Sequence, residues 1–377
     1  MRVGITLQSL DPTWGGIGIY TEEVVKHLLK LDRRNEYVLI YPGFGASRKS
    51  LGRYQRKYSN VTELETEFSR IPSGWYWDQM VVPKIAEKYA VDVLFNPYLS
   101  VPVRGRFKKV MIMHAVEYHK VPQVYDWKKY LKWFFLHKML LPRADRLISI
   151  SNLMTRDLCD SVKYPAGNIR TIYHGLSEKF RVVRDPVKLR EAKEEYRLPE
   201  RFILFVGHIY PQKNFANLVR ALHLMGDKIP HDLVVAGRPR WKHAKDIEMI
   251  DQLGLAKRVH FLYWVSNDDL PAIYSLASCF VYPSLYEAFG LAQLEAMACG
   301  CPVVASRAGA IPEISAGAAL LFDPQSPEEM GEAIFKAIAD SGLRQQLVEK
   351  GLARAKDFSW ERCSAQTLQV LEEVAGA

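Results

Sequence analysis

Two glutamates separated by seven residues are the first side chains of this sequence whose type and spacing could do chemistry. Glu287 follows an apolar run, and Glu295 lies within residues 289–299, which we predict to form a helix. Eight positions correspond to about two helical turns, so both carboxylates could contact one elongated ligand. Two carboxylates suit hydroxyl groups better than phosphates. For an isolated pair, the simpler alternative is that Glu295 is a solvated helix residue.

The backbone amides between the two glutamates could bind the anionic part of such a ligand. A glycine and a proline at 300–302 end the predicted helix, and a further parallel strand is expected to follow. Glu287 would then lie at the carboxyl end of one strand and just before a helix N-terminus, where open α/β sheets bind ligands. We therefore expect a phosphate to contact the amides of Phe289, Gly290 and Leu291.

A lysine occupies a comparable position earlier in the chain. Residues 203–206 form an apolar run that predicts a strand, and Lys213 comes shortly before the next predicted helix. A cation at this place could neutralise a diphosphate. An exposed surface lysine is the simpler interpretation of Lys213 taken alone. Arg238 follows the predicted strand 233–237 and could add a second cation.

The N-terminal half offers weaker candidates. Gly15 and Gly16 lie between a predicted strand at 3–7 and a predicted helix at 21–31, where glycine lets the backbone approach a ligand closely. The spacing is not the dinucleotide-binding fingerprint, because its third glycine is missing, and a plain turn explains the glycines equally well. His114 ends a predicted strand, although a lone histidine is more often structural.

Strands and helices alternate in two successive series around these residues. A chain of 377 residues is too long for one ordinary α/β core. We predict an N-terminal domain at 1–180, a charged linker at 181–200, and a second domain at 201–359. Because both halves carry ligand features at strand exits, the expected fold class is α/β, with two Rossmann-like domains facing across a cleft.

The segment 282–306, YPSLYEAFGLAQLEAMACGCPVVAS, resembles the signature of the retaining glycosyltransferases of family 4. The resemblance extends over essentially the whole chain and implies the two-domain GT-B architecture, with the last helix, at 360–377, crossing back to the N-terminal domain. It implies that Glu287 contacts the transferred sugar and that Glu295 binds the ribose of the nucleotide. The amides that follow Glu287 are then expected to hold sugar and phosphate.

The same resemblance assigns roles in the N-terminal half. It implies that Gly15 and Gly16 face the donor diphosphate and the acceptor, and that His114 lies beside the donor sugar. Relatives commonly have a His-Asp pair at this point, whereas this chain has Ala115, so the role of the aspartate does not carry over. His174 is a further departure, because relatives frequently have an asparagine before the glycine there.

Around Lys213 the match is incomplete. The resemblance implies that Lys213 contacts the donor diphosphate together with an arginine five residues earlier, but His208 occupies that position. A neutral imidazole does not supply the permanent, forked charge of arginine. Arg238 is our hypothesis for the compensating cation.

The implied reaction is transfer of a hexose from a nucleotide-sugar to an acceptor hydroxyl with retention at the anomeric carbon. Glu287, Lys213 and His114 are the expected catalytic residues. The loop 207–214 looks most like the mannosyltransferase-type members, which favours GDP-mannose over a UDP-sugar as donor. The sequence contains no Asp-x-Asp metal motif, and a helix dipole with Lys213 could replace a metal, so we expect neither metal nor cofactor. A sugar-nucleotide 2-epimerase of the same architecture remains the alternative.

The charge distribution bears on partners and location. The formal net charge is +9, and cations concentrate at 42–62 and 101–141, interspersed with aromatic residues. This mixture favours contact with an anionic membrane surface and a lipid-linked or saccharide acceptor, although a solvated loop at 44–58 is an equal alternative. For the predicted helix 126–141 we expect most aromatic residues to be core rather than membrane anchors. A nucleic-acid-binding protein would need a recognisable module, and only the pI of about 9.1 favours one.

Cysteine content and hydropathy indicate a compartment. The five cysteines are scattered and lack the spacing of a metal site. No apolar run approaches the roughly 18 to 20 residues that a membrane span needs. We therefore expect a cytoplasmic protein, peripheral on the inner face of the plasma membrane if the basic segments bind lipid.

Overall fold

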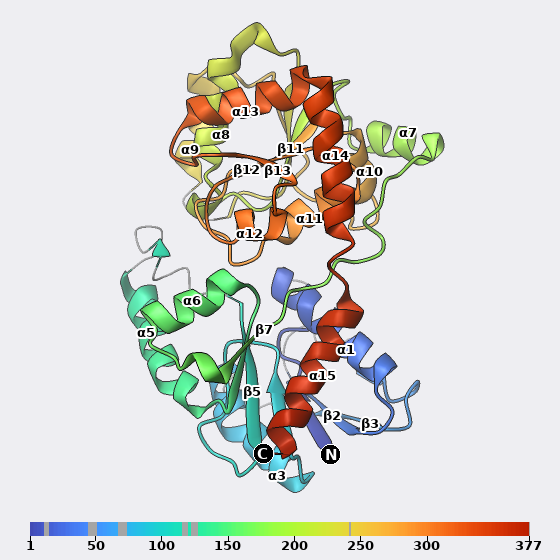
Figure 1. Ribbon diagram of the computed structural model, residues 1–377, viewed down its shortest axis with the longest axis vertical. Coiled ribbons are helices and arrows are strands. Elements are labelled where there is room, and N and C mark those ends of the chain that lie inside the picture. Colours follow the sequence, from blue (N-terminus) through green and yellow to red (C-terminus); the bar gives the residue numbers. More distant parts are fainter. Residues whose placement is uncertain are drawn as a thin grey trace. The chain divides into compact units, whose positions relative to one another are not determined.

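The protein comprises two compact units, shown in Figure 1. The computed structural model describes residues 1–10, 15–43, 51–66, 74–114, 120–121, 127–240 and 243–376. Unit 1 contains the chain up to Gly175, apart from residues 120–121, together with the C-terminal segment from Ser359. Unit 2 contains Leu176–Phe358.

Unit 1 is built on a parallel sheet of seven strands, in the order β3-β2-β1-β4-β5-β6-β7. Its strands are β1 Arg2–Thr6, β2 Glu36–Tyr41, β3 Val61–Glu65, β4 Val93–Asn96, β5 Lys108–Met113, β6 Arg146–Ser149 and β7 Ile169–Thr171. Strand order reverses between β1 and β4, which pair in parallel register. Ligands of open α/β sheets bind outside the carboxyl ends of strands at such a reversal.

The helices of unit 1 account for most of its remaining described residues. They are α1 Gly16–Leu31, α2 Gly74–Tyr76, the π-helical turn η3 Trp77–Val81, α3 Val82–Lys88, α5 Trp127–Leu140, η5 Leu141–Arg143, α6 Asn152–Ser161, η6 Ala166–Asn168 and α15 Trp360–Gly376. Helix α1 begins five residues before the predicted position, so the predicted boundary is wrong. Gly16 starts the helix, and the apolar stripe that continues through Leu28 is buried.

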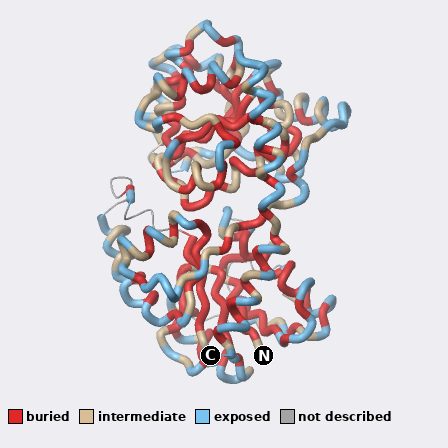
Figure 2. Tube along the Cα trace, viewed as in Figure 1, coloured by how far each residue is buried: buried red, intermediate tan, exposed pale blue. Residues whose placement is uncertain are grey.

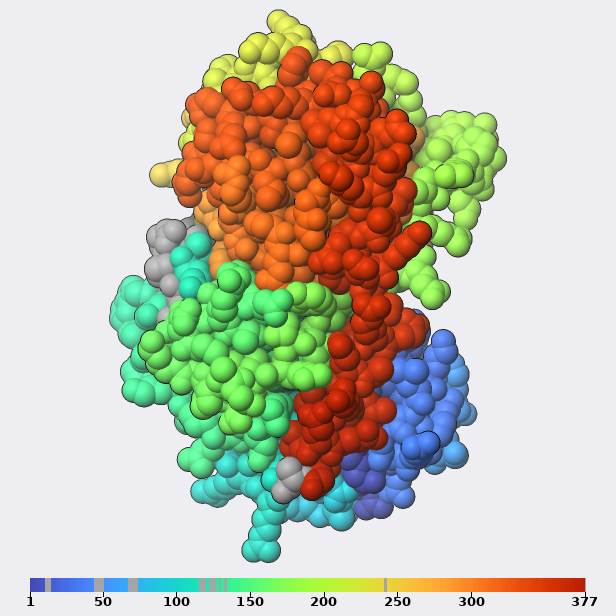
Figure 3. Space-filling view, in the orientation of Figure 1, coloured from blue at the N-terminus to red at the C-terminus, as the bar shows by residue number. Residues whose placement is uncertain are grey.

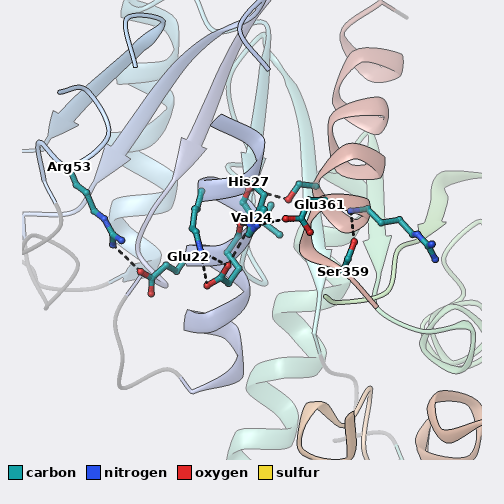
Figure 4. Close-up of polar contacts among 10 residues, drawn as sticks. Glu22, Val24, His27, Arg53, Ser359 and Glu361 are labelled. Carbon is teal, nitrogen blue, oxygen red and sulfur yellow. Dashed lines mark hydrogen bonds and ion pairs between the residues drawn. The ribbon is translucent and has the colours of Figure 1, made fainter. Parts of the chain in front are cut away.

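Helix α15 packs on α1 although more than 320 residues separate them, as Figures 3 and 4 show. The imidazole Nε2 of His27 lies 3.1 Å from a carboxylate oxygen of Glu361. Ser364 Oγ donates to the Val24 carbonyl at 3.4 Å, so the two helices are linked inside the unit and at its surface. The C-terminal segment is therefore an integral part of unit 1.

Unit 2 repeats the architecture with a parallel six-stranded sheet, in the order β10-β9-β8-β11-β12-β13. Its strands are β8 Phe202–Val206, β9 Asp232–Ala236, β10 Val259–Phe261, β11 Cys279–Tyr282, β12 Val303–Ser306 and β13 Ala319–Phe322. Its helices are α7 Pro186–Glu195, η7 Pro211–Lys213, α8 Phe215–Met225, η8 Gly226–Lys228, α9 Ala244–Gln252, α10 Leu270–Leu276, α11 Leu291–Ala298, α12 Ile311–Ser315, α13 Pro327–Ala339 and α14 Ser341–Ala355. The reversal of strand order lies between β8 and β11.

Burial explains why the central strands read as nearly continuous apolar runs. Both faces of a parallel sheet are covered by helices, so no alternation with polar residues is needed. In unit 2, Phe205 of β8 packs against Phe215 of α8 with ring centroids 5.5 Å apart, and both side chains are fully buried. Figure 2 shows the buried residues concentrated along the strands of each unit. Burying one such side chain stabilises the fold by about 1.5–3 kcal/mol.

Residues 181–200, which we predicted to be a linker, belong to unit 2 and contain α7. This helix packs on α10, and Tyr196 donates to an Asp269 carboxylate oxygen at 2.9 Å. Strand β3 and the helical segment 74–88 were not predicted, because β3 is an edge strand of mixed polarity. The mixed polarity of β3 hides it from an apolar-pattern search.

Candidate active site

Lys213 is held at the carboxyl end of β8 by the turn that precedes α8. The single turn Pro211–Lys213 leads to Asn214, which adopts the left-handed conformation with φ 56°. The side-chain amide of Asn214 donates to the carbonyls of Pro283 and Pro324, at 3.0 and 2.8 Å, and these hydrogen bonds compensate for this backbone conformation. The turn before α8 is thereby fixed to the segment that follows β11.

The loop after β11 is fixed by its neighbours on both sides. Gln212 donates through Nε2 to the Tyr286 carbonyl at 2.8 Å, and the Leu285 amide donates to the Gln212 carbonyl at 2.8 Å. On the other side, the Ala310 amide donates to the Glu287 carbonyl at 2.8 Å. These contacts fix the backbone on both sides of Glu287.

Gly309 is required for this close approach. A Cβ atom at position 309 would lie 2.4 Å from the carbonyl oxygen and 2.5 Å from the amide nitrogen of Glu287. The residue also has a positive φ of 58°, which side chains rarely adopt. Glycine at 309 therefore permits the strand-exit loops after β11 and β12 to touch.

Lys213 and Glu287 form an ion pair across the reversal of strand order. The Nζ atom lies 2.5 Å from Oε1, and each side chain is only 13% exposed. The ammonium group also lies 5.2 Å from the ring centroid of Tyr282. Burial acts to lower the pKa of Lys213, but the carboxylate of Glu287 together with Tyr282 and Tyr210 holds it well above its ordinary value. The lysine is thus a permanent cation at the place where open sheets bind ligands.

The turn after Glu287 differs slightly from the predicted helix. Helix α11 begins at Leu291 rather than at Phe289, and ends at Ala298. Gly290 precedes it with φ 97° and ψ 61°, a conformation that favours glycine. Phe289 is buried and meets Phe358 edge-on, with ring centroids 5.9 Å apart. The sequence 289–291 is therefore a tight turn into a helix N-terminus, as an anion site at this point requires.

Glu295 lies on the second turn of α11 and is not a solvated surface residue. Its side chain is partly buried, and the Tyr274 hydroxyl donates to its Oε2 at 3.3 Å. Burial raises the pKa of Glu295 to about 7, against the opposing effects of the Tyr274 hydrogen bond and of Lys179. The carboxyl group can therefore exist in either protonation state near neutral pH.

His208 and Arg238 lie together because the loops after β8 and β9 pair. The Ile209 amide donates to the Arg238 carbonyl at 3.0 Å, and the Arg238 amide lies 3.3 Å from His208 Nδ1, which therefore accepts. Burial, followed by the charge of Arg240, lowers the pKa of His208. The imidazole is thus neutral near pH 7, whereas the side chains of Arg238 and Arg240 are exposed cations beside it.

The candidates of unit 1 lie at the carboxyl end of its own sheet. Gly15 has a positive φ of 58° and precedes the first residue of α1, and a Cβ at Gly15 or Gly16 would meet no atom of the described residues within 4 Å. His114, after β5, is buried, and its Nε2 lies 3.0 Å from the Pro97 carbonyl that follows β4. Burial lowers the pKa of His114 to about 4, so the imidazole is neutral.

An aromatic cluster, which we define as Tyr20, His114, His174 and Trp360, surrounds this histidine. The ring centroid of Tyr20 lies 5.0 Å from that of His114 and 5.0 Å from that of His174. His174 stacks on Trp360, with ring centroids 5.8 Å apart. A Cβ at Gly175 would lie 2.2 Å from the Trp360 amide nitrogen. His174, which stands where relatives frequently have an asparagine, therefore packs against Trp360 of α15.

Some residues that shape the site were not predicted from the sequence. Gln212, Asn214 and Gly309 act on the backbone near Glu287, and Tyr274 contacts Glu295. Of these, Gly309 carries a sequence signal, because a glycine shortly before Pro312 marks a turn. Among the described residues, no group of three or more His, Cys, Asp or Glu side chains could hold a metal ion. Within the same part of the chain, no helix is long and apolar enough to cross a bilayer.

The fold and the site define a class of protein: a protein of two Rossmann-like units with an ion pair of Lys213 and Glu287 at the strand-order reversal of unit 2. Comparison with known proteins shows which family this arrangement belongs to. Residues 188–354 match the model of the family described as glycosyl transferases group 1, and residues 14–180 match that of glycosyltransferase family 4. The chain is 31% identical to the O-antigen chain mannosyltransferase B of Escherichia coli, over 98% of each chain.

Solved structures show the same fold. Sucrose-phosphate synthase from Thermosynechococcus elongatus superposes with a TM-score of 0.77 at 22% identity, over 99% of this chain and 98% of that one. HepE from Anabaena, in complex with UDP and glucose, gives 0.75 at 18% identity, over 99% and 100%. The chain belongs to the group 1 glycosyltransferases of family 4. The predicted fold class of two Rossmann-like domains and the predicted enzyme class are confirmed.

Proposed function

We propose that this enzyme transfers mannose from GDP-mannose to a hydroxyl group of a saccharide acceptor, with retention at the anomeric carbon. The observation that carries this assignment is the Lys213–Glu287 ion pair at the β8/β11 reversal, followed by the turn at Gly290. The choice of mannose is supported by the 31% identical E. coli mannosyltransferase, which is an O-antigen chain enzyme.

In the proposed complex the ion pair separates to serve two parts of the donor. Lys213 turns to the diphosphate, where a charge-assisted hydrogen bond is about twice as strong as a neutral one, and Glu287 accepts hydrogen bonds from the hydroxyls of the sugar. The amides of Gly290 and Leu291 at the start of α11 face the distal phosphate. Glu295, on the next turn, accepts from the ribose hydroxyls.

The reaction needs the leaving GDP to be stabilised as the sugar gains positive charge. The bond between the anomeric carbon and the diphosphate oxygen breaks, and a bond forms from the acceptor oxygen to the same carbon. The acceptor proton passes to the leaving phosphate. Preorganised cations and amides supply the largest share of such catalysis, and here they are Lys213, Arg238 and the N-terminus of α11. We therefore propose a metal-independent reaction.

In unit 1 we propose that Gly15 and Gly16 leave space for the acceptor and the diphosphate, and that His114 acts as a neutral hydrogen-bonding group toward the sugar. This is supported by the open space at both glycines and by the low pKa of His114. The acceptor we propose is a saccharide carried on a lipid, so that the enzyme works in the cytoplasm at an anionic membrane surface.

A thermal-shift titration tests the donor assignment. We expect GDP-mannose and GDP to raise the Tm, UDP-glucose and UDP to raise it less, and EDTA to have no effect. Glu295→Ala should weaken the stabilisation by GDP-mannose, while Lys336→Ala, an exposed lysine on α13, should not. A larger shift with UDP-glucose than with GDP-mannose would contradict the choice of nucleotide.

Product analysis then tests the reaction class. With donor and a mannose-containing oligosaccharide, we expect release of GDP and an elongated, α-linked product. Incubation with GDP-mannose alone should leave the nucleotide-sugar unchanged apart from slow hydrolysis. A changed nucleotide-sugar in the absence of acceptor would instead indicate an epimerase.

A further inference from the structure

Helix α5 presents apolar side chains to solvent on one face. Trp127 and Phe135 are 67% and 62% exposed, and Leu131 and Met139 are 39% and 42% exposed. Four of the 13 exposed large apolar side chains in the described residues thus belong to a single helix of 14 residues. Isolated exposed apolar residues are ordinary, but a contiguous group marks an interaction surface.

The four residues form a stripe because they recur at every fourth position. At 100° per residue they lie within an arc of about 120°. The opposite face carries His137 and Leu140, each only 2% exposed, and therefore packs into unit 1. The helix carries apolar side chains on its exposed face as well as on its buried face, whereas the exposed face of a surface helix is normally polar. Our expectation that the aromatic residues of this helix are mostly core is wrong for Trp127 and Phe135.

The described charged side chains of α5 are of one sign. Lys128 and Lys138 are exposed and lie within the same arc as the stripe, and Lys128 Nζ is 5.7 Å from the centroid of the Trp127 ring. The sequence of α5 contains no Asp or Glu. Apolar and aromatic groups that share a face with lysines suit the boundary between lipid headgroups and acyl chains, since lysine stems extend toward the headgroups.

We propose that the exposed stripe of α5 is the element by which this enzyme docks on an anionic lipid surface. Trp127, Leu131, Phe135 and Met139 enter the headgroup boundary, and Lys128 and Lys138 bind lipid phosphates. This inference rests on the proposed function and adds to it the element that binds the membrane. Helix α5 lies at the outer side of unit 1 in Figure 1.

The other basic segment is less suited to this role. Tyr54 and Tyr58 of the segment 44–58 are each only 4% exposed, so they are core residues and not membrane anchors. Arg53 pairs with Glu22 at 2.9 Å, and Arg33 lies over the Tyr58 ring at 4.3 Å. Residues 44–50 lie outside the described residues. The described side chains therefore make α5 the better candidate of the two basic segments for contact with a membrane.

Co-sedimentation with vesicles tests the assignment without donor or acceptor. The full chain should bind vesicles of phosphatidylcholine and phosphatidylglycerol at low salt, and bind pure phosphatidylcholine far less. W127A/F135A should weaken binding by about tenfold or more through lost apolar contact. K128E/K138E should weaken it by about tenfold or more, because each lysine near the surface contributes about fivefold.

The control variant removes exposed apolar residues elsewhere. L224A/F335A changes side chains of unit 2 that are 48% and 41% exposed, and should bind vesicles like the wild type. Failure of the wild type to bind, or equal binding by all variants, overturns the assignment. Light scattering that shows a dimer disrupted by W127A/F135A, without lipid binding, assigns the stripe to a second copy and also overturns it. GDP-mannose titration of W127A/F135A should be unchanged, which separates this test from that of the donor.

Discussion

The two units share a parallel sheet with the same reversal of strand order, but their carboxyl ends differ in chemistry. In unit 2 the edge carries a partly buried ion pair, a partly buried carboxyl group and a neutral histidine beside exposed arginines. In unit 1 the corresponding edge carries the aromatic cluster, whose two histidines are buried and have lowered pKa values. The fold thus determines where a ligand site lies, and the side chains at strand exits decide what it binds.

The difference also concerns how each edge is stabilised. In unit 2 the Gln212 side chain donates to the Tyr286 carbonyl and the Ala310 amide donates to the Glu287 carbonyl, so the backbone that carries Glu287 is held before a ligand arrives. Unit 1 orients His114 through packing against Tyr20 and one hydrogen bond. A preorganised charged edge suits a diphosphate, and a neutral edge suits an uncharged sugar.

The largest effect is expected from removing the cation of the unit 2 edge. Lys213→Met should lower kcat/KM by about 10²- to 10³-fold, as the loss of one preorganised group that stabilises transition-state charge commonly does, and Glu287 would be left as an unpaired anion beside the diphosphate. Steady-state transfer from GDP-mannose measures this, with Lys336→Met as the control. If the kcat/KM of the variant stayed within threefold of the wild-type value, Lys213 would not be the residue that contacts the diphosphate.

Lowering the pH should reduce the stability of unit 1 through His114. Its pKa is about 4 in the folded protein against an ordinary 6.5, so between pH 6.5 and 4 the unfolded state binds the extra proton and stability falls. The linked loss is about 3 kcal/mol when the pH passes through this window. His114→Gln should therefore lose less stability than the wild type between pH 7 and 4.5 in urea unfolding. Parallel curves for the two proteins would show that the histidine is not held neutral by burial.

A glycine pair tests the backbone contact that orients Glu287. Gly309 and Gly317 both have positive φ, at 58° and 83°, but only a Cβ at 309 would collide with Glu287. Gly317→Ala should cost about 1 kcal/mol of stability for its backbone conformation, with activity retained. Gly309→Ala should cost about 2 kcal/mol or more and reduce transfer about tenfold. Equal activities would mean that the loop after β12 does not position the glutamate.

The smallest effect is expected at His208. Because its imidazole is neutral near pH 7, His208→Arg adds a cation at the β8 exit and should tighten GDP-mannose binding by about fivefold. Isothermal titration at neutral pH measures the change. For the wild type alone, affinity should rise as the pH falls below 6.5 and the imidazole gains its proton. Much weaker binding by the arginine variant would show that histidine has a role of its own.

The sequence was sufficient for the class of fold and for the regions that carry the site. Apolar runs located strands such as those predicted at 3–7, 203–206 and 233–237, because strands buried on both faces are almost wholly apolar. Strand β3 was missed, since it lies at the sheet edge and has only one fully buried residue. Helix boundaries at Gly16 and Leu291 differed by a few residues because backbone conformation at glycine, not apolar periodicity, sets them.

The sequence by itself determined that Lys213 and Glu287 each stand at a strand exit, and the family to which the pattern belongs. Only the tertiary structure decided that they form an ion pair, because β8 and β11 become neighbours through a crossover that local sequence does not encode. The same holds for α5: composition showed its cations and aromatic residues, but which face is exposed depends on packing against the rest of unit 1. Residue type fixes what a side chain can do, and long-range packing fixes its neighbours, its exposure and its pKa.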